Sequence, residues 1–223
     1  MAFSATRLAG HQATALTQLR AAGILPIVTV DSIDQAMAMA DALQQGGLHS
    51  IELTLRTPAA LPALAALKRG RPDLVVGAGT VLTPDQLEAA IQAGADFIVT
   101  PGATPTMVEA LANADLPVVC GAATPSELLV LLERGFRVAK LFPAAAVGGI
   151  GMLKNLHGPL ADLMFCPTGG ISETDAADYL AQPNVACIGG SWMVPRNWLQ
   201  AGEFDKVRDS AARAKLIADR FRT

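Results

Sequence analysis

The chain has 223 residues, which suits one α/β domain and leaves no room for a second hydrophobic core. Hydrophobic residues make up 51% of it and charged residues 17%, a balance typical of folds whose parallel strands are buried on both faces. A formal net charge of −3 argues against nucleic acid as a partner, and no apolar run reaches the ~20 residues that span a membrane. Because the first ten residues also lack the apolar core of a signal peptide, we expect a cytoplasmic protein with one domain over residues 1–223.

Short β-rich segments alternate with Ala- and Leu-rich helical segments along the whole chain. A helix over residues 10–22 is expected to precede the first strand and cover the bottom of the fold, and a helix over residues 203–222 follows the last strand. The predicted strands cover residues 24–30, 50–55, 74–79, 97–100, 117–121, 137–142, 164–168 and 185–190. Eight strands interleaved with helices predict an α/β fold, a (β/α)8 TIM barrel with an N-terminal helix.

The second predicted strand has a strict alternation of polar and apolar residues. Glu52, Thr54 and Arg56 share one face, while the apolar residues between them face the helices. We therefore expect Glu52 and Arg56 to point into the barrel or its mouth. Glu52 can act as a general acid/base and Arg56 can bind a carboxylate through its fork of donors, or the two can form an ion pair with each other.

Thr-Pro pairs mark four predicted strand-to-helix transitions. Threonine is a good helix N-cap, and proline is tolerated in the first helical turn because its missing N–H costs nothing there. Two of these threonines are followed by Gln86 and Glu127 at the spacing of a capping box. The four predicted caps are Thr57, Thr83, Thr104 and Thr124.

Lys140 is the only one of the five lysines that lies inside a predicted strand. Strand alternation places it on the same face as Val138 and Phe142. Burial of an amine lowers its pKa and favours the neutral form, which is the form that attacks a carbonyl. Lys140 is therefore the candidate covalent nucleophile; the alternative is a lysine whose stem packs in the barrel while its charged end reaches the solvent.

Two glycine-rich turns follow the seventh and eighth predicted strands. Thr168-Gly169-Gly170 ends one strand and Gly190-Ser191 ends the next. In barrels these two loops often bind phosphate through backbone N–H groups, although tight turns also favour glycine. We predict a phosphate site here.

Metal chemistry has no support in the sequence. The three histidines are scattered, and Cys120, Cys166 and Cys187 each lie in an apolar segment outside any CxxC pair. We expect the cysteines to be buried core thiols and predict neither a metal nor a cofactor.

Six motifs together resemble the 2-keto-3-deoxy-6-phosphogluconate (KDPG) aldolases, whose bifunctional members also cleave 4-hydroxy-2-oxoglutarate (KHG). In chain order the motifs cover residues 52–57, 77–82, 100–102, 140–144, 165–171 and 189–192. The resemblance implies a homotrimeric class I aldolase that splits a phosphorylated keto acid into pyruvate and glyceraldehyde 3-phosphate. Relatives often place a glutamate after the Phe-Pro-Ala of the fourth motif, where this chain has alanine, so its finer substrate preference is open.

The resemblance also implies a role for each matching residue. Lys140 would form the Schiff base and Glu52 would move protons through a water, with Phe142 beside the imine. The pyruvate carboxylate would be bound by Arg56, Thr80 and Pro101. The phosphate would be bound by Thr168, Gly169, Gly170, Gly190 and Ser191.

Two other functions compete with the aldolase hypothesis. A phosphosugar isomerase barrel would use the same glycine turns but has no need of a buried strand lysine. A non-catalytic phosphate-binding protein would have no need of Glu52, Arg56 and Lys140 together. The stereochemistry at C4 and the pathway served are not indicated by the sequence.

Overall fold

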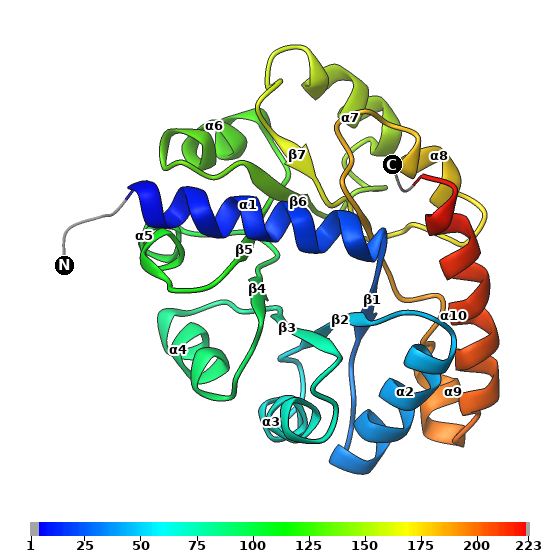
Figure 1. The fold of residues 1–223 in the computed structure, drawn as a ribbon. Coiled ribbons are helices and arrows are strands. Elements are labelled where there is room, and N and C mark those ends of the chain that lie inside the picture. Colours follow the sequence, from blue (N-terminus) through cyan, green and yellow to red (C-terminus); the bar gives the residue numbers. More distant parts are fainter. Residues whose placement is uncertain (1–4, 222–223) are drawn as a thin grey trace.

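The computed structural model describes residues 5–221, which form one parallel sheet of eight strands surrounded by helices (Figure 1). The strands are β1 Ile24–Val28, β2 Ser50–Thr54, β3 Val75–Gly79, β4 Phe97–Val99, β5 Val118–Ala122, β6 Val138–Leu141, β7 Met164–Phe165 and β8 Ile188–Gly190. The helices are α1 Ala5–Ala22, α2 Ile33–Gln45, α3 Ala60–Gly70, α4 Pro84–Gln92, α5 Pro105–Asn113, α6 Pro125–Glu133, α7 Gly149–His157, α8 Ala176–Leu180, α9 Arg196–Ala201 and α10 Phe204–Asp219.

The strands are paired in the order β7-β6-β5-β4-β3-β2-β1-β8, so neighbours in sequence are neighbours in the sheet. Between β7 and β8 there is no continuous ladder. Two isolated parallel bridges, Phe165 to Val185 and Thr168 to Gly189, join the two edges instead. They lie within the predicted strands 164–168 and 185–190, and the ladder is interrupted where Pro167 has no N–H to donate. The predicted (β/α)8 barrel is confirmed, with a weaker seam at this one joint.

Strand alternation separates two layers of core. The inner layer fills the barrel and includes Val138, Cys166 and Cys187, whereas the outer layer packs the strands against the helices and includes Cys120. All three thiols are buried, as predicted.

Helix α1 covers the end of the barrel at which the strands begin (Figure 1). Its buried Gln12 donates to the carbonyl of Val118 at 2.9 Å and accepts from the amides of Arg137 and Val138 at 2.9 and 3.0 Å. The helix starts at Ala5, earlier than predicted, and the expected cover at the bottom is confirmed. The opposite end, where the strands finish, is the mouth of the barrel.

Three of the four predicted threonine caps are confirmed. Thr83, Thr104 and Thr124 each accept a hydrogen bond from the amide three residues later, at 3.2–3.3 Å. A complete capping box forms at Thr124 with Glu127, whereas the Gln86 side chain accepts from a different amide.

The predicted cap at Thr57 is wrong. Helix α3 begins at Ala60, and the Thr57 hydroxyl donates to the carbonyl of Val30 at 2.6 Å. The helix therefore starts too late for Thr57 to be its cap, and the hydroxyl instead ties the loop after β2 to the segment after β1.

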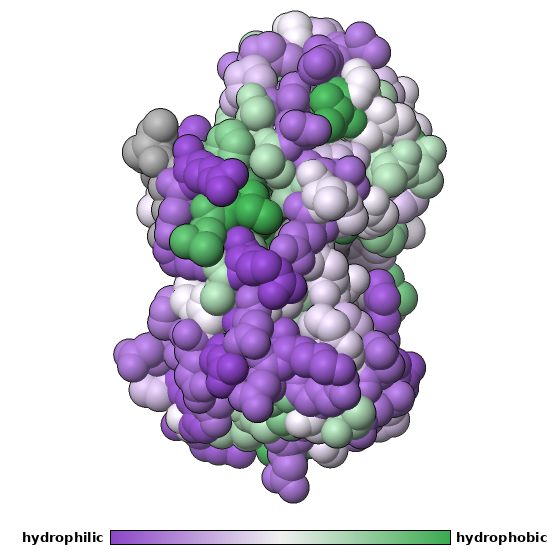
Figure 2. All heavy atoms as spheres, turned by 90° about the vertical axis from the view of Figure 1, so that its right-hand side faces the viewer, coloured by the Kyte–Doolittle hydropathy of each residue, from purple (hydrophilic) through white to green (hydrophobic). Residues whose placement is uncertain are grey.

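The face that carries α10 is mainly hydrophilic (Figure 2). Its charged side chains form local ion pairs, including Arg208 with Asp205 and Lys215 with Asp219. Helix α10 ends at Asp219, and residue 222 of the predicted helix lies outside the described residues. Within residues 5–221, no helix combines the length and apolar character needed to cross a membrane.

Candidate active site

Lys140 of β6 and Glu52 of β2 meet inside the barrel although 88 residues separate them in the chain. The lysine Nζ donates to Glu52 Oε1 at 3.0 Å and to Oε2 at 3.2 Å. Only 6% of the lysine side chain and 2% of the glutamate side chain are exposed. Two charges at this depth are stabilised only if they pair closely, since desolvation of each is costly. The carboxylate is also in place to take the proton that the amine must lose before it attacks a carbonyl.

Local sequence explains why the two side chains can meet. Each is the third residue of its strand, and in β6 the alternation points Val138 and Lys140 toward the inner core. The neighbouring strand β3 contributes Gly79, where a side chain would overlap the Glu52 carboxylate. The glycine-rich β3 therefore makes room for this carboxylate.

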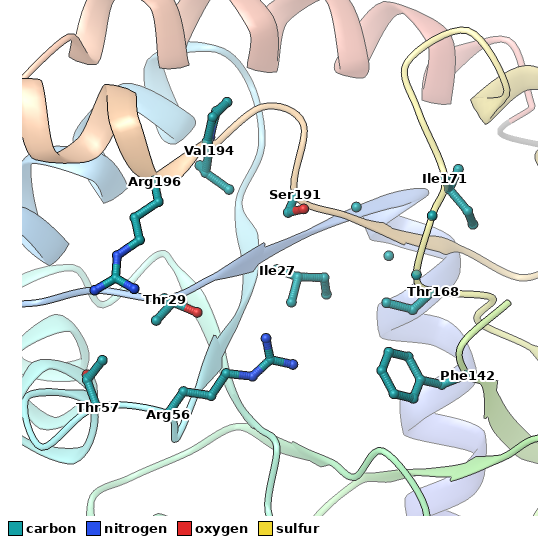
Figure 3. A pocket seen from close by; sticks show the side chains of 15 residues that line it. Ile27, Thr29, Arg56, Thr57, Phe142, Thr168, Ile171, Ser191, Val194 and Arg196 are labelled. Atoms are coloured by element: carbon teal, nitrogen blue, oxygen red, sulfur yellow. The ribbon is translucent and has the colours of Figure 1, made fainter. Parts of the chain in front are cut away.

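A cavity of about 540 Å³ opens at the mouth of the barrel (Figure 3). Arg56 and Phe142 line it, and so do all five residues predicted to bind phosphate: Thr168, Gly169, Gly170, Gly190 and Ser191. The other predicted residues, Lys140, Glu52, Thr80 and Pro101, are not among the residues that line it. Phe142 connects the cavity to the buried pair, because Lys140 Nζ lies 5.3 Å from the centre of its ring.

Arg56 lies just past the end of β2 and its side chain extends into the cavity (Figure 3). Its Nε donates to Thr80 Oγ1 at 3.2 Å, so Thr80 helps to orient the guanidinium. The alternative ion pair between Glu52 and Arg56 is wrong, because Glu52 is paired with Lys140. Pro101 packs against Gly121, where a side chain would overlap the Pro101 backbone, and it does not line the cavity.

The glycine turns present unused hydrogen-bond donors. Within residues 5–221, the amides of Gly169, Gly170 and Ser191 and the Ser191 hydroxyl donate no hydrogen bond. Gly169 and Gly170 have φ values of 101° and 75°, and a Cβ at Gly170 would lie 2.6 Å from the Cβ of Ala145. Consecutive amides in such a conformation form a concave site for an anion. The cavity therefore combines an anion site with Phe142, the lining residue that contacts the buried amine.

The sequence profile of the family described as KDPG and KHG aldolase matches residues 16–210 of the chain. The chain belongs to this family. It is therefore an aldolase, a lyase that acts on a carbon–carbon bond.

Named relatives agree with the family match. The 2-dehydro-3-deoxy-phosphogluconate aldolase of Pseudomonas aeruginosa is 46% identical over 191 residues, which cover 86% of this chain and 87% of that protein. The KHG/KDPG aldolase of Escherichia coli is 42% identical over 197 residues, covering 86% and 92%. The crystal structure of the KDPG aldolase from Legionella pneumophila matches with a TM-score of 0.87 and 39% identity, covering 89% of this chain and 96% of that one. That structure holds pyruvate as a covalent carbinolamine intermediate.

Sequence reasoning missed part of the cavity wall of this KDPG and KHG aldolase family member. Ile27, Thr29, Val194 and Arg196 also line the cavity. Ile27 and Thr29 lie in or just after β1, and strand-end position was the signal that could have found them. Arg196 begins α9 after the second glycine turn, where its residue type alone gave no indication of a role.

The buried thiols do not compete with Lys140 as nucleophiles. Burial raises the pKa of Cys120 to about 11 and raises that of Cys187 well above its ordinary range. A thiol attacks as the thiolate, so these groups are unreactive near neutral pH. Within residues 5–221, no three His, Cys, Asp or Glu side chains gather as a metal site would require.

Proposed function

We propose that the protein is a class I aldolase that cleaves KDPG to pyruvate and glyceraldehyde 3-phosphate through a Schiff base on Lys140. One observation carries the proposal: a buried lysine and glutamate, 3.0 Å apart, lie behind a cavity that has an arginine and unpaired backbone amides on its wall. The activities named for the relatives in Pseudomonas aeruginosa and Escherichia coli support the same substrate.

The reaction begins with covalent capture of the ketone. Arg56 binds the substrate carboxylate through its fork of donors and holds the C2 carbonyl near Lys140. Glu52 accepts a proton from the amine, and the amine adds to C2 to form a carbinolamine. Glu52 then returns this proton to the C2 hydroxyl, which leaves as water, so that Glu52 is a carboxylate again and an iminium ion forms. Its positive nitrogen is the electron sink for the next step.

Cleavage follows at the C3–C4 bond. The C4 hydroxyl gives its proton to Glu52 through a water, the bonding electrons move to the iminium nitrogen, and the aldehyde departs with its phosphate. The remaining enamine takes a proton from Glu52 at C3. Water then hydrolyses the restored iminium, which releases pyruvate and regenerates the free lysine.

The distal phosphate is assigned to the glycine turns. Gly169, Gly170 and Ser191 have free N–H groups there, the Ser191 hydroxyl adds a further donor, and Thr168 and Gly190 shape the wall. KHG shares the reactive half of KDPG and is proposed as a second substrate, cleaved to pyruvate and glyoxylate. The isomerase and binding-protein alternatives assign no role to the buried ion pair of Lys140 and Glu52.

Three further assignments follow from the sequence analysis, the first of them from the resemblance alone. The enzyme is proposed to be a homotrimer, to act in the cytoplasm, and to form one domain over residues 1–223. The compact sheet of eight neighbouring strands supports the last of these.

Reductive trapping tests the mechanism. Incubation with pyruvate and borohydride is expected to convert the Schiff base into a stable secondary amine that peptide mass spectrometry locates on Lys140. Lys154→Ala, which changes a lysine of α7, is the matched control and is expected to keep the adduct. An adduct on a different lysine, or active enzyme without any adduct, would overturn the mechanism.

A further inference from the structure

Arg196 lies on the rim of the cavity and has no part in the reaction proposed above. It is the first residue of α9, and its side chain extends from that helix over Thr29 (Figure 3). Its Nη2 donates to Asp31 Oδ1 at 2.9 Å, and Gln200 donates to the other Asp31 oxygen at 3.3 Å. The arginine is therefore held in place from the segment that follows β1.

The charges that line the cavity are of one sign. Arg56 and Arg196 are its only charged lining residues in the described part of the chain, and no carboxylate lines it. The proposed reaction uses Arg56 for the substrate carboxylate. A phosphate at the glycine turns adds almost two further negative charges. Arg196 is the remaining cation of the wall that can balance them.

The guanidinium also has donors to spare. Within residues 5–221, Asp31 is its only hydrogen-bond partner, and 63% of the Arg196 side chain is exposed. Asp31 orients the arginine and at the same time cancels part of its charge. A residue held in this way attracts a nearby anion more strongly when its own carboxylate partner is neutralised.

We propose that Arg196 is a specificity-determining residue that favours substrates with a phosphate at the end distal to the keto acid. Asp31 weakens the attraction between Arg196 and that phosphate. The proposal rests on the proposed function for its substrate. It adds an arginine to a phosphate site that otherwise consists of backbone amides and a hydroxyl.

Two variants are expected to move substrate preference in opposite directions. Arg196→Ala should raise KM for KDPG about five-fold, the effect of one largely exposed charge, and leave KM for unphosphorylated 2-keto-3-deoxygluconate unchanged. Asp31→Asn keeps an oxygen for Arg196 but removes the negative charge, so KM for KDPG should fall about two-fold. Arg208→Ala, which removes an arginine of α10 paired with Asp205, is the control and should leave KM unchanged for both substrates.

A purely structural contact would give a different result. If the pair only ties α9 to the segment after β1, both variants should raise KM for both substrates, and that outcome would overturn the proposal. Equal KM values for KDPG in Arg196→Ala and the unaltered enzyme would do the same.

Calorimetric titration with inorganic phosphate tests the site without any catalysis. Binding should weaken in Arg196→Ala, tighten in Asp31→Asn, and depend on salt concentration less in the first variant. If the unaltered protein binds no phosphate, or if Arg196→Ala binds it as tightly, the proposal fails. Absence of keto acid cleavage and of a trapped adduct would instead refute the proposed function, and the titration would still decide the role of Arg196.

Discussion

The buried pair of Lys140 and Glu52 gives a prediction about stability as well as about activity. Lys140→Met keeps a side chain of similar length and removes its charge, which leaves the Glu52 carboxylate buried at 2% exposure without its partner. Glu52→Gln likewise leaves the Lys140 amine buried without its charged partner. Removal of one member of a buried pair costs about 3–5 kcal/mol of unfolding free energy. Each single variant should therefore lose a large share of the roughly 5–15 kcal/mol that stabilises a typical domain.

The double variant should be more stable than either single one. With both charges replaced by neutral side chains of similar shape, no uncompensated charge remains, and such replacements are often neutral. We expect the double-mutant cycle to give a coupling of about 3 kcal/mol. All three variants should lose cleavage, because neither the nucleophile nor the proton carrier can be spared.

Urea unfolding followed by circular dichroism measures the free energies, and pyruvate release measures cleavage. Lys68→Met is the matched control, since Lys68 forms an ion pair with Asp96 that is only half-buried, with 23% and 29% of the side chains exposed. It should cost about 1 kcal/mol and keep full activity. Single variants as stable as the unaltered protein, with no coupling between them, would refute the reasoning.

Two substitutions test the cavity, and the reactivity of two cysteines tests the core. Arg56→Lys removes the planar fork, so KM for the keto acid should rise about ten-fold with kcat nearly unchanged; an unaltered KM would count against the carboxylate site. Gly170→Ala adds a Cβ at a φ of 75° and 2.6 Å from Ala145, so it should cost about 1 kcal/mol, lower Tm by about 3 °C and weaken phosphate binding; equal Tm and affinity would contradict this. Burial raises the pKa of the Cys120 thiol from 9.0 to about 11, so the stability that it contributes is complete below pH 9 and is lost as pH rises to about 11. A thiol reagent should label Cys120 and Cys187 only after unfolding, and rapid labelling of the folded protein would contradict this.

The barrel and its inward-facing residues could be predicted because both depend on local pattern. Eight apolar segments with regular spacing located the strands, and alternation within β2 and β6 placed Glu52 and Lys140 inside. Their partnership could not be predicted, because it depends on how strands 88 residues apart meet across the barrel. Alternation alone allowed Arg56 to pair with Glu52, but β2 ends at Thr54, the chain turns there, and the Arg56 side chain contacts Thr80 instead.

Arg196 and Thr57 show the other limit of sequence reasoning. Arg196 belongs to the cavity only because α9 and the segment after β1 come together, and its bond to Asp31 joins residues far apart in the chain. Thr57 had the right neighbours for a helix cap, but α3 starts at Ala60, and the Thr57 hydroxyl binds the carbonyl of Val30 instead. In both cases the outcome depends on contacts between segments that come together only on folding.

The interrupted seam between β7 and β8 has a consequence for local stability. The loops assigned to the phosphate leave the barrel at this joint, one from each side, and only isolated bridges hold the joint below them. Local opening favours regions with the fewest backbone hydrogen bonds, so amide exchange should be fastest here among the strands. An anion bound by both loops would add hydrogen bonds across this joint, so phosphate should slow amide exchange there.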